Sequence, residues 1–308
     1  MTPILKFIEP LLVDTPVEWD QYLLTDEDFA KVIEPVSLIE KTKLVLAGVG
    51  DYEGISLPWA KVSGHVRLRK GKVSIWAGLT HHGKTTVLKQ ICMHLAKCGE
   101  KVCIASLEEF PEETFADLVR MAVGNSATND EALRMVAEWA TGKIWLYDQQ
   151  GMIRADRMLA VAAYAAKQKG VTHFVIDSLM KMGVASDDFE GQRIFFNRVT
   201  AYAKALNMHI HVVCHMRKQG DESLPGIMGV RGASAMIDQT DNIFIVWRDK
   251  REDRLPSEPA GLLIVEKQRG QRPNWLGSVR LWYDGPTGQF VDGPDNRPMA
   301  FLTQEIPW

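Results

Sequence analysis

The chain has 308 residues, of which 46% are hydrophobic and 24% charged, and its net charge is −3 at pH 7. This composition excludes a wholly disordered chain, and the charge excludes nucleic-acid binding through a globally basic surface, so any such contact needs a local patch. No apolar run is long enough to span a membrane and no secretory signal begins the chain, which predicts a cytoplasmic protein. We expect the cysteines, which form no C-x-x-C pair, to be small buried residues, namely Cys92, Cys98, Cys103 and Cys214.

Residues 1–60 lack the alternating pattern of the later chain. A helix could start near Thr25, and the Gly-rich break "GVGDYEG" precedes "LPWAKVSG". Because the segment is too small for an independent catalytic domain, we expect a docking arm or linker. The expected organisation is this arm at 1–60, a main domain at 61–293 and a C-terminal tail at 294–308.

The stretch "VSIWAGLTHHGKTTVLKQ" predicts a buried strand from Val73 to Gly78, a turn, and a helix from Lys84. The turn matches G-x-x-x-x-G-K-[ST] in full, and its glycines, Gly78 and Gly83, let backbone N–H groups converge on a phosphate at a helix N-terminus. We therefore expect a bound nucleotide, held by Lys84 at the outer phosphates, Thr85 at a magnesium ion and Thr86 near the inner phosphates.

Two adjacent histidines, His81 and His82, lie inside this turn. A pair of histidines is compatible with a metal, but nothing nearby in the sequence completes a ligand set with the spacing of a metal site. We expect both side chains to face solvent.

Strand patterns follow the turn at "KVCIASLE", "KIWLYD", "THFVIDSL" and "HIHVVCH", with helix-length segments between most of them. This alternation predicts an α/β fold with a mostly parallel sheet and helices on both faces. The later segments "DNIFIVWRD", "GLLIVEKQR" and "SVRLWYDGPTGQFV" are joined by short connections, which predicts C-terminal antiparallel strands.

Carboxylates end two of these strands. Asp177 would orient the magnesium ion at the carboxyl edge of the sheet, although a strand-ending aspartate also commonly caps a turn. Glu108 falls within its strand pattern and would polarise an attacking water beside the γ-phosphate. A helix start at Pro111 accounts for Glu112 and Glu113.

Basic groups end two further strands. His215 would sense the γ-phosphate, although a structural role is the more common one for a single histidine. Lys267 and Arg269 lie on one face of a late strand and would reach a neighbouring subunit's nucleotide, the alternative being a solvated strand end.

The motifs "LEEFPEETFADL", "CHMRK", "RGASAMIDQTDNIFIVWRD" and "EKQRGQRPNWLG", in this order, resemble the helicase domain of the DnaB-like ring helicases. The similarity is greatest to the helicase half of phage primase-helicases and Twinkle, and it covers most of the chain. It implies a RecA-like P-loop NTPase core that hydrolyses ATP with Mg²⁺ and unwinds DNA as a ring, expected to be a hexamer. A separate primase and polymerase are expected partners.

The resemblance also implies individual roles. Lys84, Glu108, Asp177 and His215 would serve hydrolysis in one subunit and Arg269, helped by Lys267, in its neighbour. The nucleotide base would lie between Arg248 and Tyr283, although an exposed arginine and a core tyrosine are nearly as well supported. The DNA phosphates would be contacted by loops after Asp177 and His215, through Lys181, Arg217, Lys218 and Arg231.

Two features depart from the family. The phosphate loop reads T-H-H where the family has small residues, and there is neither a zinc-ligand cluster nor a primase domain. Two other functions stay open: a RecA-like recombinase or regulatory ATPase, and a nucleotide-gated helicase loader or scaffold. The chain ends in "FLTQEIPW", which is either a partner-binding tip or a disordered tail.

Overall fold

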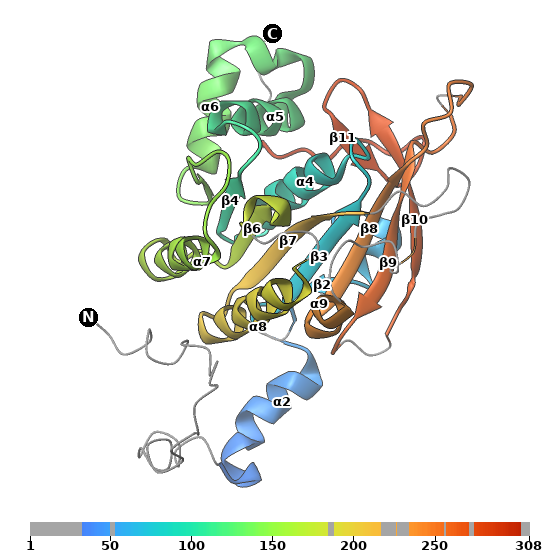
Figure 1. Cartoon of the computed structure of the whole chain (residues 1–308). Coiled ribbons are helices and arrows are strands. Elements are labelled where there is room, and N and C mark those ends of the chain that lie inside the picture. The colour runs from blue at the N-terminus through green and yellow to red at the C-terminus, as the bar shows by residue number, and fades with distance from the viewer. Residues whose placement is uncertain are drawn as a thin grey trace. The chain divides into compact units, whose positions relative to one another are not determined.

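The computed structural model describes residues 33–49, 53–183, 188–216, 226, 234–255, 257–270 and 274–302 (Figure 1). The chain forms two compact units, Met1–Glu53 and Gly54–Trp308. In the described part of the first unit, η3 (Pro35–Leu38) leads into α2 (Ile39–Ala47), and neither helix has a buried side chain. The helix expected near Thr25 and the last six residues of the tail lie outside the described residues.

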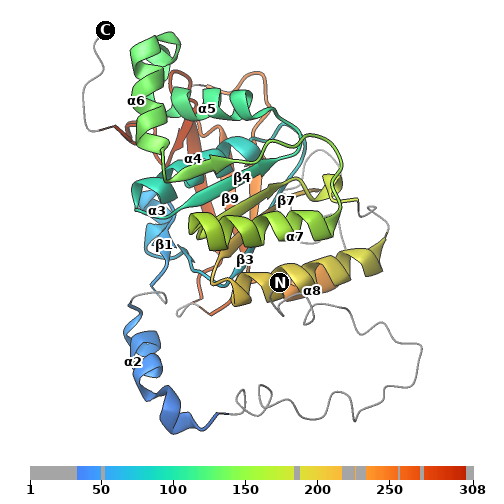
Figure 2. The same cartoon turned by 90° about the vertical axis from the view of Figure 1, so that its left-hand side faces the viewer.

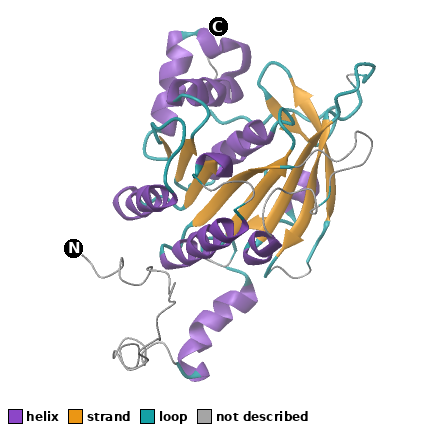
Figure 3. Cartoon of the chain, in the orientation of Figure 1, coloured by secondary structure: helices purple, strands orange, loops and turns teal. Residues whose placement is uncertain are grey.

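In the described part of the second unit, nine strands form one sheet in the order β11-β10-β9-β8-β3-β7-β6-β4-β5 (Figure 3). Their bounds are β3 (Val73–Gly78), β4 (Val102–Ser106), β5 (Ile144–Leu146), β6 (His173–Asp177), β7 (His209–His215), β8 (Asn242–Arg248), β9 (Gly261–Gln268), β10 (Gly277–Asp284) and β11 (Gln289–Val291). The six neighbouring strands β8, β3, β7, β6, β4 and β5 are parallel. The pairs β8–β9, β9–β10 and β10–β11 are antiparallel. A separate two-stranded sheet pairs β1 (Ile55–Ser56) with β2 (Arg67–Leu68).

The helices of this unit follow the strands. They are α3 (Ala60–Ser63), α4 (Lys84–Lys97), α5 (Pro111–Val123), α6 (Asp130–Ala140), α7 (Ala155–Tyr164), α8 (Phe189–Ala205) and α9 (Ser234–Gln239), with short helical turns η5 (Gly124–Thr128), η6 (Ala165–Lys169) and η7 (Leu179–Lys181). Local chemistry sets several starts. Pro111 opens α5, the Asn129 side chain accepts N–H groups at the start of α6, and the Asp188 carboxylate does so for α8.

Both faces of the sheet are buried. On one face, Trp76 and Phe244 stack on each other and belong to the same core cluster as Val87 and Ile91 of α4. On the other face, α8 contacts β3 and β7 and packs against α7 and α9, and Figure 2 shows α7 and α8 running side by side. A parallel sheet covered on both faces requires the continuous apolar strands that the sequence contains.

The sequence predicts this fold closely. β3 and β7 have the expected bounds, α4 begins at Lys84, and the C-terminal strands are antiparallel. One expectation about the cysteines is wrong: Cys98 is exposed, because it follows the last residue of α4 instead of lying on its packed face, whereas the other three are buried. Within the described residues, no helix combines the length and apolarity that crossing a membrane requires.

Candidate nucleotide site

The phosphate loop connects β3, which is buried throughout, to the N-terminus of α4. Gly83 has φ +84°, and His81 has φ +63°, so the backbone turns through the left-handed region twice. A Cβ on Gly78 would lie 2.5 Å from the carbonyl oxygen of Val246, which means that only glycine fits where the loop leaves β3. The loop has the shape that the sequence predicts.

The two loop histidines differ from each other. His81 is exposed, as expected, but His82 is only 5% exposed, and the expectation of a solvent-facing side chain is wrong for it. The Nδ1 atom of His82 accepts a hydrogen bond of 3.0 Å from the backbone N–H of Arg248, at the end of β8. Because this partner is distant in the sequence, no local pattern indicates it.

Lys84 is the first residue of α4, and its side chain is 6% exposed. Its Nζ donates to the carbonyl oxygen of Leu79, 2.9 Å away, within the phosphate loop itself. Burial lowers the pKa of Lys84, and the carboxylates of Asp177 and Glu108 oppose that shift. The cation is therefore placed inside the loop before any phosphate binds. Thr86, two residues further along α4, is half-buried.

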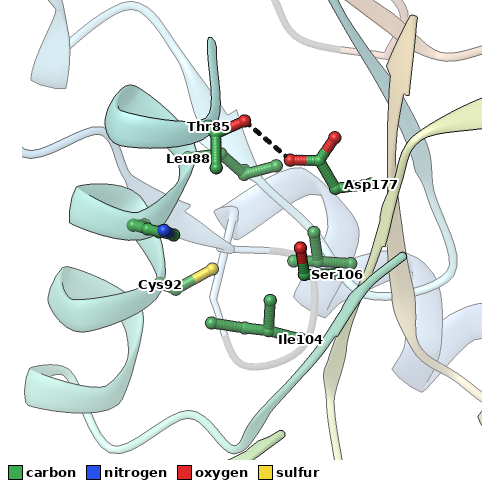
Figure 4. Close-up of a pocket in the computed structure, with 8 residues that line it drawn as sticks. Thr85, Leu88, Cys92, Ile104, Ser106 and Asp177 are labelled. Carbon is green, nitrogen blue, oxygen red and sulfur yellow. Dashed lines mark hydrogen bonds between the residues drawn. The ribbon is translucent and has the colours of Figure 1, made fainter. Parts of the chain in front are cut away.

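Thr85 and Asp177 meet across the gap between α4 and β6. The Thr85 hydroxyl donates to Asp177 Oδ2 at 2.8 Å, as Figure 4 shows. Burial raises the pKa of Asp177 to about 6, the Thr85 hydrogen bond and Lys84 oppose the shift, and Glu108 and Glu109 add to it. An adjacent hydroxyl and carboxylate are hard oxygen ligands of the kind that Mg²⁺ prefers, so these residues fit the ion.

A cavity of about 10 Å³ lies beneath this pair, between α4 and strands β4 and β6 (Figure 4). This volume is close to the minimum for one water molecule. The residues that line it are Thr85, Leu88, Lys89, Cys92, Ile104, Ser106, Val175 and Asp177. The cavity is too small for a nucleotide.

Glu108 is held at the same edge of the sheet. The Ser178 hydroxyl donates to Glu108 Oε1 at 2.8 Å, and His215 Nε2 lies 4.0 Å from the same oxygen. The expectation that Glu108 belongs to the strand is wrong, because β4 ends at Ser106. The carboxylate stands on the loop that follows, where it is partly exposed.

Two supporting residues, Ser178 and Lys89, are not predicted from the sequence. Ser178, which directly follows Asp177, orients Glu108. Lys89, 3% exposed on α4, pairs with Glu109 Oε2 at 2.5 Å and Asp117 Oδ2 at 2.6 Å, and the hydrogen bonds of these carboxylates raise the pKa of Lys89 against the effect of its burial. A lysine among the apolar residues of α4 is the sequence signal that could have indicated the pairing of Lys89 with these two carboxylates.

Lys267 and Arg269 come together at the C-terminal end of α9. Lys267 Nζ donates to the carbonyl oxygens of Ile237 and Asp238, at 2.5 and 3.2 Å, and Arg269 donates to Asp238 at 2.7 Å. The two cations therefore share one face, as the sequence predicts, and cap the carbonyl end of a short helix.

Arg248 and Tyr283 lie on the face of the sheet that packs on α4. Arg248 pairs with Gly261 of β9, which in turn pairs with Leu281 of β10. Leu281 belongs to the core cluster that includes α4, and Tyr283, two residues later on the same strand, lies on the same face. Tyr283 is 47% exposed rather than a core residue, and its ring is 5.3 Å from that of Phe290.

The candidate DNA contacts fall mostly on residues that the structure does not describe. Lys181 ends η7, close after Ser178, and is half-buried. Arg217, Lys218 and Arg231 lie outside the described residues.

Known proteins share this architecture. An ATPase domain of known structure aligns with 84% of this chain and 98% of its own, with a TM-score of 0.71 and 17% identity. A DnaB-like replicative helicase, solved in a study of its interactions with primase, aligns with 86% of this chain and 69% of its own, with a TM-score of 0.70 and 16% identity. The predicted RecA-like fold is confirmed.

Two relatives are similar in sequence. The DNA helicase/primase of Enterobacteria phage T3 is 26% identical over 209 residues, which are 60% of this chain. The chloroplastic/mitochondrial Twinkle homolog protein of Arabidopsis thaliana is 22% identical over 265 residues, which are 80% of this chain. The chain spans 37% of the length of each. The predicted resemblance to phage primase-helicases and Twinkle is confirmed.

The phosphate loop, the Thr85–Asp177 pair and Glu108 all fall in the part of the chain that matches a described protein family. The model of that family, an AAA domain, matches residues 51–221. This stretch is more than half of the 308 residues, and the chain therefore belongs to the AAA domain family.

Proposed function

We propose that this chain is an ATP-dependent replicative DNA helicase, which forms a ring and translocates on single-stranded DNA. The observation that carries the proposal is the gathering of Lys84, the Thr85–Asp177 pair and the Ser178-bound Glu108 at the carboxyl edge of one sheet. Parallel sheets bind their ligands at this edge. The names of the two sequence relatives, a helicase/primase and a Twinkle homolog, supply the DNA-unwinding part of the proposal.

ATP and Mg²⁺ are the ligands that these side chains fit. The loop N–H groups and the N-terminus of α4 would bind the β- and γ-phosphates, and Lys84 would exchange the Leu79 carbonyl for phosphate oxygen. Thr86 would contact the inner phosphates. Thr85 and Asp177 would hold Mg²⁺, which neutralises charge that develops on the phosphate oxygens.

Glu108 is the group that would take up the proton of the attacking water. Because the Ser178 hydroxyl occupies Oε1, the other oxygen is left to accept a hydrogen bond from that water. As the water oxygen bonds to the γ-phosphorus, its proton passes to Glu108 and the bond to ADP breaks. His215, next to both Glu108 and the phosphate loop, would transmit the state of the γ-phosphate to the chain that follows it.

The site would be completed by a neighbouring subunit. Arg269, assisted by Lys267, would reach the γ-phosphate bound next door, and both would then leave the carbonyl end of α9. Six such interfaces would close a ring around DNA, with Lys181, Arg217, Lys218 and Arg231 at its phosphates. The base would lie between Arg248 and Tyr283.

The N-terminal segment, residues 1–60, would act as an arm on the adjacent subunit, with 61–293 as the ATPase domain and 294–308 as a tail. Support comes from α2, on which Ile39, Leu44 and Leu46 are exposed. Exposed apolar side chains on one short helix favour burial against a partner. A separate primase and polymerase would work with the ring.

The test is ATP-dependent unwinding of a forked DNA duplex. Glu108→Gln should lower the unwinding rate by about 10²- to 10⁴-fold, because it removes the base and keeps the shape. Glu112→Gln is the matched control, since Glu112 is an exposed glutamate in the first turn of α5 and should not change the rate. Wild-type protein that hydrolyses ATP and never unwinds DNA would contradict the helicase proposal.

A further inference from the structure

The phosphate loop contacts the end of strand β8 and the residues that follow it at three points. Gly78 lies so close to Val246 that a Cβ would be 2.5 Å from its carbonyl oxygen. His82 Nδ1 accepts the Arg248 N–H at 3.0 Å, and Lys250 Nζ donates to the carbonyl oxygen of Thr80 at 3.4 Å. Of these, the His82 contact is the one made by a buried side chain of the loop itself.

The hydrogen bond fixes the chemical form of His82. Nδ1 can accept only with its lone pair free, so the ring proton resides on Nε2. Burial, and then the cations of Lys250, Lys84 and Arg248, lower the pKa of His82 to about 4. The ring is therefore neutral near pH 7, and the contact with β8 persists there.

This contact joins the two ends of the proposed nucleotide site. The loop would hold the phosphates, and Arg248 would cover one side of the base. Across the sheet, Arg248 and Tyr283 are separated by β9, which puts their strands about 10 Å apart at the usual spacing. Gly261, which lies opposite Arg248 on β9, has no side chain to fill the space between the two strands.

We propose that His82 is a positioning residue for the nucleoside of the bound nucleotide. By holding the backbone of Arg248 to the phosphate loop, it sets the distance between the phosphate cradle and the base-contacting groups, so the site favours a complete nucleoside triphosphate over inorganic polyphosphate. The inference rests on the proposed function, because it requires that the loop binds ATP with its base at Arg248.

The test compares two ligands, a non-hydrolysable ATP analogue and inorganic tripolyphosphate, by calorimetric titration. His82→Leu removes the acceptor at similar size, and we expect about tenfold weaker binding of the ATP analogue with tripolyphosphate binding unchanged. His82→Asn places Oδ1 close to the position of Nδ1 and should restore most of the affinity. His65→Asn, at an exposed histidine outside the phosphate loop, is the control and should leave the binding of both ligands unchanged.

Several results would overturn the proposal. Equal losses for both ligands would mean that His82 only maintains the loop, and no loss for either would mean that the contact is irrelevant to binding. His82→Asn as weak as His82→Leu would exclude the hydrogen bond as the cause. A wild-type protein that binds neither ligand would instead refute the proposed function.

A measurement on the wild-type protein keeps the proposal testable if a variant does not fold. In ¹⁵N-histidine NMR spectra, His82 should show an unprotonated Nδ1 and a protonated Nε2, both before and after the ATP analogue is added. The opposite tautomer, or loss of this pattern on binding, would contradict a positioning role.

Discussion

Strands β6 and β7 carry titratable side chains at both ends, and the two ends differ in what surrounds these side chains. At their amino ends, His173 and His209 are fully enclosed, together with His211. At their carboxyl ends, Asp177 lies beside the phosphate loop and His215 is partly exposed. The same strands therefore separate a sealed cluster from an accessible one.

The amino-end histidines bond to one another and to neighbouring residues of the sheet, and His173 Nε2 has no hydrogen-bond partner among the described residues. His173 Nδ1 and His211 Nε2 are 3.1 Å apart, His209 bonds the Ser74 hydroxyl at 2.8 Å, and Trp76 Nε1 donates to His211 at 3.1 Å. At the carboxyl end, Asp177 accepts the Thr85 hydroxyl at 2.8 Å, and His215 Nε2 lies 4.0 Å from Glu108 Oε1. Polar residues on one sheet are thus enclosed in the core at its amino end and lie beside the phosphate loop at its carboxyl end.

The largest expected effect comes from removing either of two cations of the proposed shared site, Lys84 of one subunit or Arg269 of its neighbour. Lys84→Met and Arg269→Ala should each lower ATP hydrolysis by about 10²- to 10³-fold, because each removes a cation from the developing phosphate charge. Co-expressed in equal amounts, they should recover about a quarter of the wild-type rate, since one interface in four would hold both native residues.

The measurement is the hydrolysis rate of the purified mixture, with each variant alone as its control. No recovery on mixing would argue against a site shared between subunits. Full activity of Arg269→Ala by itself would remove Arg269 from the reaction.

The second effect concerns the sealed amino end. Burial lowers the pKa of His209 to about 4, and burial followed by the neighbouring histidines lowers the pKa values of His173 and His211 well below their usual value. Folded histidines with lowered pKa values stay neutral while the unfolded chain takes up protons, so stability is complete above about pH 6.5 and falls toward pH 4. The expected loss at pH 5 is about 2 kcal/mol from His209, with further losses from His173 and His211, and it is partly offset by Asp177, whose raised pKa acts in the opposite direction.

Urea unfolding at pH 7, 6 and 5 measures this loss. His173→Phe should reduce the slope by about one fifth, because it removes one of the five described histidines whose pKa is lowered, namely His82, His94, His173, His209 and His211. A free energy of unfolding that is flat from pH 7 to pH 5 would contradict the account of the sealed cluster.

The smallest effect sharpens the role of Ser178. Ser178→Ala removes the donor to Glu108 Oε1, and kcat for ATP hydrolysis should fall about tenfold with KM unchanged, because the carboxylate loses its orientation and the nucleotide keeps its contacts. Ser178→Thr, which retains a hydroxyl, should recover much of the rate. An equal change in KM would indicate that Ser178 supports the fold of the site in general.

The sequence was sufficient for the parts of the molecule that local patterns determine. The buried run from Val73 to Gly78 and the run "HIHVVCH" predict β3 and β7 with their observed bounds, since continuous apolar runs specify buried parallel strands. Thr85 and Asp177 also come together as expected, because the carboxyl ends of parallel strands share one edge.

What the sequence could not supply depends on partners far along the chain. The buried side chain of His82 accepts a hydrogen bond from the backbone N–H of Arg248, which is distant in the sequence. Lys89 pairs with carboxylates on the loop after β4 and on α5. Strand β4 ends at Ser106, before Glu108, and the apolar pattern of the strand does not mark this end. The roles of Arg217, Lys218 and Arg231 stay predictions, as these residues lie outside the described structure.

The most direct test of the central claim is the rate of ATP hydrolysis by the wild-type chain, with and without single-stranded DNA, at one fixed salt concentration because DNA affinity depends on it. A DNA-translocating motor predicts hydrolysis that rises about tenfold or more when DNA is added. A rate that DNA leaves unchanged, or no hydrolysis at all, would contradict the claim that the carboxyl edge of this sheet is the active site of a helicase.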